Sequence, residues 1–309
     1  MLFEIRILLT IVLISTFILT CNGQPRTTVK LTSPLKMTKS PLKMKPTTKT
    51  TFPVPIPFKF LLSINNEQLA AVLTDDLIEI WSSDFYPKQF KPNLSFITSI
   101  AQLNNQTLII GNNICEIQLF NFKSNTTTVL NQFKASTQNS IDSLVGFNLN
   151  AKQYIGSASL GLIQIWDADA VKNVANLTSA NNKPITCLKF DVSSSLLASG
   201  SEDGSIQLWN SAIFKKIENL PDHTDKINAI ILIDNKTIAT ASRDLTISIW
   251  DLTNNQQLKT ISASNFGVLS LVNLNKDWFA SGSYDNDIKI WNSLKSFLNG
   301  KVNSNMTLI

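Results

Sequence analysis

The stretch LLASGSEDGSIQLWN (residues 196–210) decides the fold, because it returns twice further along the chain. The copies are TIATASRDLTISIWD (237–251) and WFASGSYDNDIKIWN (278–292). All three begin with alternating apolar and small polar residues, pass through a turn that carries aspartate, and end a second alternating run at tryptophan. These tryptophans, Trp209, Trp250 and Trp291, follow one another at intervals of 41 residues. Self-similarity at a fixed period of this size predicts a repeat architecture.

Three weaker copies continue the same frame upstream. Their aromatic positions are Trp81, Phe120 and Trp166, in LAAVLTDDLIEIWS, TLIIGNNICEIQLFN and YIGSASLGLIQIWD. Each of the six units holds four short runs of period-two alternation, such as INAIILI, TIATAS, TISIWDL and QLKTISA in the fifth, which predict strands. Four antiparallel strands cannot bury both of their faces alone. We therefore expect the units to stack radially into an all-β propeller.

The units resemble WD repeats (WD40), a β-propeller family, over roughly residues 56–302. The resemblance rests on the ASGSEDGSIQLW core and on the Trp-Asp or Trp-Asn endings, with Asp167 and Asp251 in the strict form. It implies a WD-type propeller over residues 53–309 with six recognisable four-stranded blades, ending near residues 81, 120, 166, 209, 250 and 291. After Trp291 the sequence suffices for one outer strand and a short tail, so a seventh blade is not visible. Three alternatives stay open: a ring of six blades, a truncated chain, or half of an assembly.

The single histidine of the chain, His223, has a structural role in this resemblance. The family pattern implies one hydrogen-bonded tetrad of His223, Thr240 (or Ser242), Asp244 and Trp250. Tryptophan only donates through its indole N–H and an ionised aspartate only accepts, whereas histidine and a hydroxyl do both. Buried together, these groups satisfy one another and fix the strands that carry them. We therefore expect His223 to belong to the framework and not to a catalytic site.

The other units keep only parts of this tetrad. The fourth keeps Ser199, Asp203 and Trp209, with Asn181 or Asn182 in place of histidine, and the sixth keeps Ser281, Asp285 and Trp291, with Ser264 or Asn265 in that place. The first has Asp75 and Trp81. In the second and third, Ile114 and Leu160 occupy the position of the turn aspartate, so we expect those blades to depend on packing alone.

The amino terminus predicts entry into the secretory pathway. Arg6 precedes a run of about fourteen mostly apolar residues, and Cys21 and Gly23 suit cleavage before Gln24. The run is short for a membrane span, which needs about 20 residues. Residues 1–23 are thus predicted to be a signal peptide and residues 24–52, rich in Pro, Thr and Lys, a disordered linker. The alternatives are a membrane anchor formed by the uncleaved segment, or a cytoplasmic protein if the signal is not used.

The charge distribution argues against nucleic acid as a partner. The net charge of +5 comes from the front of the chain, where residues 24–59 hold eight basic and no acidic residues. From Phe60 onward, 18 basic residues face 21 acidic ones, so the propeller offers no basic face. Cys115 and Cys187 fall in units two apart, and we expect both to be small buried residues rather than a disulfide.

No pattern of catalytic, metal-binding or cofactor-binding residues occurs in the sequence. The predicted function is therefore a non-catalytic scaffold, without cofactor, that binds other proteins. Its candidate partner-binding rim consists of Glu202, Arg243 and Tyr284, each directly before a turn aspartate. The alternative is a secreted or surface propeller that binds or hydrolyses glycans, for which the paired acids Asp75/Asp76 and Glu202/Asp203 are the candidates.

Overall fold

The computed structural model describes eleven segments of the chain, which all lie at or beyond residue 58. These are residues 58–64, 68–82, 88–92, 94–129, 140–179, 181–191, 194–220, 223–275, 278–285, 287–292 and 307–308. The predicted signal peptide (1–23) and linker (24–52) lie outside them. Within these segments no helix is long and apolar enough to cross a membrane.

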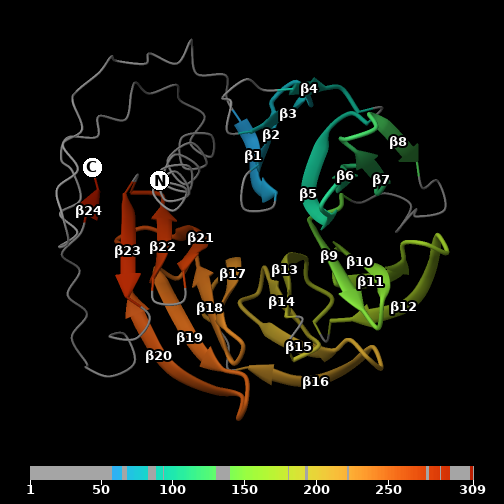
Figure 1. Cartoon of the computed structure of the whole chain (residues 1–309). Helices are drawn as coiled ribbons and strands as arrows, with labels where there is room; N and C mark the ends of the chain where they lie inside the picture. The colour runs from blue at the N-terminus through green and yellow to red at the C-terminus, as the bar shows by residue number, and fades with distance from the viewer. Residues whose placement is uncertain are drawn as a thin grey trace, which may run out of the picture.

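The described residues form six antiparallel sheets of four strands each, which we number as blades 1 to 6 (Figure 1). Blade 1 holds β1 (Phe58–Ile64), β2 (Gln68–Leu73), β3 (Ile78–Trp81) and β4 (Lys88–Phe90). Blade 2 holds β5 (Ile97–Asn104), β6 (Thr107–Asn112), β7 (Ile117–Asn121) and β8 (Thr126–Val129). Blade 3 holds β9 (Ser143–Leu149), β10 (Lys152–Ser159), β11 (Leu162–Asp167) and β12 (Lys172–Thr178).

The second half of the ring repeats this order. Blade 4 holds β13 (Ile185–Asp191), β14 (Leu196–Ser201), β15 (Ile206–Asn210) and β16 (Lys215–Leu220). Blade 5 holds β17 (Ile227–Asp234), β18 (Thr237–Ser242), β19 (Thr246–Asp251) and β20 (Gln256–Ser262). Blade 6 holds β21 (Val268–Asn275), β22 (Trp278–Ser283), β23 (Ile288–Asn292) and β24 (Thr307–Leu308). The predicted all-β propeller with six four-stranded blades is thereby confirmed, and the described part of the chain contains no helix.

The first strand of each blade lies innermost, and the first strands of successive blades pack against one another from β1 to β21 (Figure 1). The strands form where apolar and polar residues alternate with a period of two. In β5, for example, buried residues alternate strictly with partly exposed ones, because only one set of side chains faces the core. Since each blade is a simple meander, the turn between its second and third strands lies on the same face as the loop that leads to the next blade.

The core consists of apolar clusters between neighbouring blades. Between blades 5 and 6, the aliphatic face formed by Ile247 and Ile249 packs against Phe279 and Trp291. Four equivalent clusters join blades 1 to 5 in the same way. In blades 2 to 6 the aromatic residue that ends the third strand is at most 3% exposed: Phe120, Trp166, Trp209, Trp250 and Trp291. Each of these rings fills the face of the preceding blade, which explains why the aromatic position survives in the weak repeats.

The turns between the second and third strands of blades 1, 2, 4 and 5 have a left-handed residue at the same position. Asp76, Cys115, Gly204 and Leu245 have φ angles of 64°, 60°, 88° and 77°. Glycine is required at only one of these positions. A Cβ atom on Gly204 would lie 2.2 Å from the carbonyl oxygen of His223, so the backbone of the next blade's loop leaves no room for a side chain.

We predict that Gly204→Ala lowers the free energy of unfolding by at least about 1–2 kcal/mol, since it adds a steric clash to an unfavourable left-handed backbone. Leu245→Ala is the matched control, because Leu245 occupies the equivalent position, is exposed and already has a positive φ. It should change stability by less than about 0.5 kcal/mol. Chemical denaturation of both variants measures the difference, and equal losses would contradict this explanation of Gly204.

Candidate functional site

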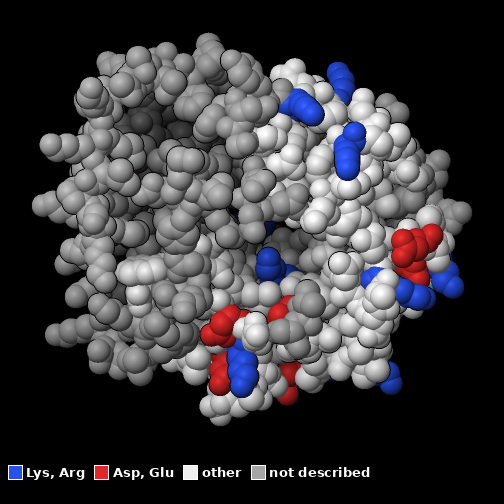
Figure 2. All heavy atoms as spheres, viewed as in Figure 1, with Lys and Arg blue, Asp and Glu red and all other residues white. Residues whose placement is uncertain are grey.

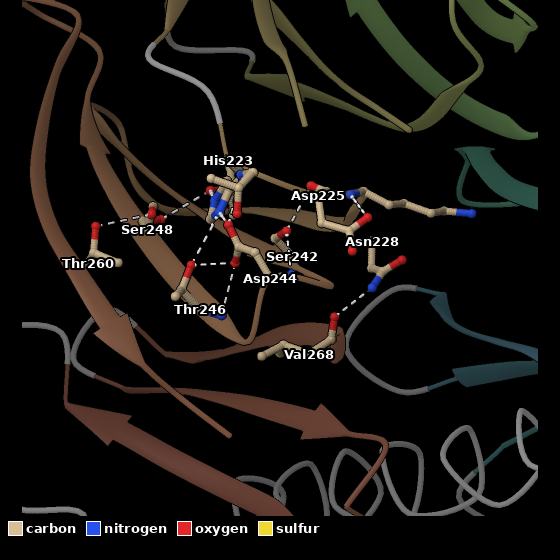
Figure 3. Close-up of polar contacts among 12 residues, drawn as sticks. His223, Asp225, Asn228, Ser242, Asp244, Thr246, Ser248, Thr260 and Val268 are labelled. Carbon is tan, nitrogen blue, oxygen red and sulfur yellow. Dashed lines mark hydrogen bonds and ion pairs between the residues drawn. The ribbon is translucent and has the colours of Figure 1, made fainter. Parts of the chain in front are cut away.

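The tetrad of blade 5 is assembled by the loop before β17, by strands β18 and β19 and by the turn between them. Figure 3 shows its members His223 and Asp244. His223 is 6% exposed, and its Nδ1 lies 2.7 Å from Oδ2 of Asp244. Its Nε2 lies 2.8 Å from Oγ1 of Thr240, and this oxygen also accepts the indole N–H of Trp250 at 2.8 Å. Both ring nitrogens of His223 are thus engaged within the framework. The arrangement holds the loop, the turn and the strand together, and the Thr240 hydroxyl that meets the histidine is fully buried.

Asp244 is the residue through which most of these contacts run. It accepts hydrogen bonds from the backbone N–H of Thr224 at 3.1 Å, and from the backbone N–H and Oγ1 of Thr246 at 3.0 and 2.6 Å. Burial acts to raise the pKa of the Asp244 carboxyl group, but the hydrogen bond from Thr246 and the neighbouring His223 outweigh it and lower the pKa below the ordinary value. Asp244 is therefore ionised at neutral pH and acts as an acceptor only.

The sequence left Thr240 and Ser242 open as the hydroxyl of the tetrad, and the geometry places Thr240 there. Ser242 has another role, because its Oγ donates to the carbonyl oxygen of Asp225 at 2.9 Å and accepts the backbone N–H of Asp244 at 3.0 Å. It therefore braces the turn that positions Asp244. The contribution of Thr246 was missed, although its place two residues after Asp244 is typical of a turn closed by a side chain.

Blades 4 and 6 each contain two separate halves of this arrangement. Trp209 donates to Ser199 at 2.9 Å, and Trp291 donates to Ser281 at 2.8 Å. The other half joins the loop to the turn: Asn181 donates to Asp203 at 2.9 Å, and Ser264 donates to Asp285. The sequence left the histidine position open between Asn181 and Asn182 in blade 4 and between Ser264 and Asn265 in blade 6. Asn181 and Ser264 occupy it. Neither side chain is long enough to link the two halves as histidine does.

The expectation that blades 2 and 3 depend on packing alone was wrong. In blade 3 the indole of Trp166 donates to Ser157 at 2.9 Å, so this half of the tetrad is present without a turn aspartate. In blade 2 the side-chain oxygen of Asn112 accepts the backbone N–H groups of Ile114 and Glu116 at 3.1 and 2.8 Å. Asn112, at the end of the second strand, therefore closes the turn of blade 2. It does what the turn aspartate does in other blades, although it occupies a different position in the repeat.

Blade 1 departs furthest from the common arrangement. Ala71 pairs with Glu79 where Thr240 pairs with Ser248, so no hydroxyl receives the indole. Trp81 donates instead to Oε2 of Glu79 at 3.1 Å, and Gln89 holds the other carboxylate oxygen at 2.8 Å. The hydrogen bond of Trp81 thus runs along its own strand and does not connect the strand to the turn.

One carboxylate of each acidic pair proposed for glycan chemistry is bound within its turn. Asp76 lies 2.7 Å from Nζ of Lys59 and accepts the backbone N–H of Phe96 at 2.6 Å. Burial opposes these contacts, but together they lower its pKa. In Asp203, hydrogen bonds from Ser205 and Asn181 overcome the burial effect and lower the pKa to about 2. Both carboxyl groups are ionised at neutral pH, which is the opposite of what a general acid requires.

In the described residues, neither the cysteines nor the metal-ligating residue types form a second site. Cys115 is buried, Cys187 is partly buried, and neither forms a disulfide with another described residue; burial raises the pKa of Cys187 to about 12. In the described segments, no group of three or more His, Cys, Asp or Glu residues could hold a metal ion. Side chains of lysine or arginine are visible in the hollow at the centre of the ring (Figure 2). Lys189 lies on the innermost strand β13, where surrounding protein lowers the pKa of its ammonium group.

The three candidate rim residues occupy equivalent positions on one face. The backbone N–H groups of Glu202, Arg243 and Tyr284 donate to the carbonyl oxygens of Pro184, Lys226 and Gly267 at 2.9, 2.9 and 3.1 Å. These bonds join each turn to the loop that enters its blade. The side chains of all three residues are exposed, and Nε of Arg243 lies 3.9 Å from the carboxylate of Asp225.

The same face carries a group of exposed apolar residues that the sequence alone did not single out. We call it the apolar rim, and its members lie in turns between second and third strands or in loops between blades: Phe96, Ile114, Leu160, Leu245, Phe266 and Tyr284. Their exposed fractions range from 40% for Leu245 to 66% for Phe96. In a sequence with strong alternation, apolar residues are normally expected in the core. Only the location of these six residues in turns and loops indicated that they are exposed.

We predict that His223→Ala and Asp244→Ala each lower the free energy of unfolding by about 1–3 kcal/mol, because each leaves buried polar groups without partners. The double variant should lose less than the sum, since both residues act in one network. In blade 4 the halves are not bridged, so Ser199→Ala and Asp203→Ala should be additive within about 0.5 kcal/mol. Denaturation curves of the six variants measure both couplings. Additive losses in blade 5 would show that the tetrad does not act as a unit.

Comparison with known proteins finds the repeats in the same places. Residues 172–210, 214–251 and 255–292 match the family described as WD domain, G-beta repeat (WD40). Each matched segment starts at or just before the outer strand of one blade and ends with the third strand of the next, so each repeat links two blades. No curated protein matches the sequence.

Solved structures support the fold. The crystal structure of the computationally designed Ika8 protein is similar over 80% of this chain and 73% of that chain, with 18% sequence identity and a TM-score of 0.65. At this identity the likeness shows the fold alone. The matched repeats and the arrangement of the strands give one conclusion: the chain carries three consecutive WD40 repeats within a six-bladed β-propeller.

Proposed function

We propose that the protein is a non-catalytic interaction scaffold, and that other proteins bind to the face that carries the apolar rim. The observation that supports this most directly is the shared location of the rim's six large apolar side chains, which are exposed on one face of the ring. Single exposed apolar residues are common on soluble proteins. A set of them on one face, among polar residues, is typical of a protein-binding surface.

The neighbouring side chains favour the same use. Tyr284 belongs both to the apolar rim and to the candidate partner-binding rim, and Arg243 directly precedes Asp244 in the turn of blade 5. Tyrosine and arginine contribute more binding energy in protein interfaces than most residues, since they combine a large contact area with hydrogen bonding. Glu202 adds an acidic group to this surface.

The backbone beneath the apolar rim is held in place before any partner binds. The backbone N–H of Asn113, next to Ile114, donates to the carbonyl oxygen of Phe96 at 3.2 Å, and that of Tyr284 donates to Gly267. In blade 5 the tetrad fixes both the entering loop and the turn. Because these loops need little further ordering, binding to them costs less conformational entropy than binding to unstructured segments.

Binding or hydrolysis of glycans is less well supported. A glycosidase needs one carboxyl group with a raised pKa as its acid and a second one nearby. Asp76 and Asp203 have lowered pKa values and are tied to Lys59 and Asn181 respectively. These contacts favour a structural role for Asp76 and Asp203 and support the scaffold over the enzyme.

We predict that Phe266→Ser together with Tyr284→Ser abolishes the capture of partner proteins from an extract of the source cells, while the melting temperature stays nearly unchanged. The matched control is Ile213→Ser together with Ile217→Ser. Those residues are 61% and 46% exposed, but they lie in the turn before β16 and in β16, away from the apolar rim. Quantitative mass spectrometry of the captured proteins compares the variants with the native chain.

Equal losses in both double variants would show that the capture is not specific to the apolar rim. Turnover of a glycan library that disappears in Asp75→Asn or Asp76→Asn would instead overturn the scaffold and favour an enzyme.

A further inference from the structure

We propose that the chain carries N-linked oligosaccharides at three turns of the ring, on Asn105, Asn125 and Asn235. These sites are separate from the apolar rim and do not depend on the proposed function. Each asparagine begins an Asn-x-Thr triplet whose middle residue is not proline: NQT, NTT and NKT. Such a triplet is the acceptor for N-glycosylation in proteins of the secretory pathway. The signal peptide predicted for residues 1–23 is the route by which the chain enters that pathway.

The three asparagines lie in turns, where a bulky hydrophilic group finds room. Asn105 lies in the turn between β5 and β6, and Asn235 occupies the equivalent position between β17 and β18. Asn125 lies directly before β8, at the end of the turn that follows β7. All three residues are exposed. An oligosaccharide attached to any of them therefore extends into solvent and displaces no packed side chain.

Two of these turns are closed by the residue before the acceptor asparagine. Oδ1 of Asn104 accepts the backbone N–H of Gln106 at 3.0 Å, and Oδ1 of Asp234 accepts that of Lys236 at 2.8 Å. The acceptor asparagine, one position further along, forms no side-chain hydrogen bond with another described residue in either turn. The two side chains thus have separate uses, since the first closes the turn and the second is left for modification.

The third turn shows the same division of roles. Oδ1 of Asn121 accepts the backbone N–H groups of Lys123 and Ser124, each at 3.0 Å. Asn125 has no side-chain hydrogen bond to another described residue. Its amide group is therefore accessible, and the turn does not depend on it.

A fourth described triplet differs from these three. Asn176 lies within the outer strand β12, and its side-chain oxygen accepts hydrogen bonds from Gln164 at 3.4 Å and from Asn173 at 3.1 Å. Its amide group belongs to a surface network, so the assignment is restricted to the three turns. Two further triplets, at Asn93 and Asn305, lie outside the described residues.

The three sites share one face of the ring. Because each blade is a meander, the turns after its first and third strands lie opposite the turn after its second strand. The apolar rim lies on the latter face. Blades 2 and 5, which carry the three sites, lie across the ring from each other (Figure 1). Oligosaccharides at these positions cover the face opposite the apolar rim and leave the rim free.

The modification is a glycosyl transfer to the side-chain amide, whose nitrogen carries two N–H groups. Nδ2 of the asparagine forms a bond to the anomeric carbon of an oligosaccharide that is carried by a lipid diphosphate. The bond from this carbon to the diphosphate oxygen breaks, the lipid diphosphate leaves with the electron pair, and Nδ2 loses one proton. A transferase of the secretory pathway catalyses this step, so the ring itself needs no catalytic group.

The test is site-specific mass spectrometry of the full chain expressed in eukaryotic cells. Enzymatic release of N-linked oligosaccharides in oxygen-labelled water converts each modified asparagine to a labelled aspartate. We expect the label at Asn105, Asn125 and Asn235. Before release, the protein should migrate more slowly in gel electrophoresis than it does afterwards.

Two matched pairs of variants separate the triplet from the asparagine itself. Thr127→Ala destroys the triplet of Asn125 and should abolish the label there, whereas Thr126→Ala changes the neighbouring threonine, preserves the triplet and should keep the label. Thr107→Ala and Gln106→Ala form the same pair for Asn105.

A stability measurement distinguishes modification from a structural role. In protein that is expressed in bacteria and therefore carries no oligosaccharide, Asn105→Gln should leave Tm nearly unchanged, because this side chain has no described partner.

Two results would overturn the proposal. The first is a secreted chain in which the three asparagines carry no label. The second is a chain that stays unmodified in the cytosol and acquires the label only when an established secretion signal replaces residues 1–23. The turns would then be suitable acceptors that this protein does not use. Neither result involves the capture of partner proteins, so failure here is distinguishable from failure of the proposed function.

Discussion

The structure depends on one repeated contact, in which the aromatic residue at the end of a third strand fills the aliphatic face of the preceding blade. A four-stranded antiparallel sheet has two faces and cannot bury both by itself. Trp250 against blade 4 and Trp291 against blade 5 show how neighbouring blades solve this problem for each other. In blade 2, Phe120 makes the same contact without an indole N–H. Apolar packing is therefore the common requirement, and the hydrogen bond of tryptophan is an addition to it.

The polar contacts fix the positions of loops that the packing alone leaves free. His223 is long enough to connect Thr240 with Asp244, so blade 5 joins its strand, turn and entering loop in one network. Asn181 in blade 4 and Ser264 in blade 6 reach only the turn. The face that carries the apolar rim is thus held by hydrogen bonds whose extent differs from blade to blade. Because the turns and the entering loops are joined, the exposed side chains above them keep their relative positions, which supports the proposed use of this face.

Much of the fold was predictable, because strand alternation and the 41-residue period are properties of local sequence. The choice of Thr240 over Ser242 was not, since both lie on the same face of β18 and the path of the preceding loop decides which one His223 meets. The bond between Trp166 and Ser157 was missed because the turn aspartate served as the marker of the tetrad. The exposure of Phe96 and Phe266 depends on where loops emerge from the ring, which residue type alone does not reveal. The assignment of the face to partner binding remains a proposal, since it rests on exposure and position.

The central claim is that packing of the aromatic ring, more than its hydrogen bond, holds neighbouring blades together. Its most direct test compares the free energy of unfolding of Trp250→Phe and Trp250→Ala in denaturant titrations. Trp250 is 1% exposed, so removal of its ring in Trp250→Ala should cost about 3–5 kcal/mol. Trp250→Phe keeps an aromatic ring in the same face, as Phe120 does in blade 2, and should lose no more than about half of that. Equal losses in the two variants would contradict the claim and assign the stability of the ring to the tetrad.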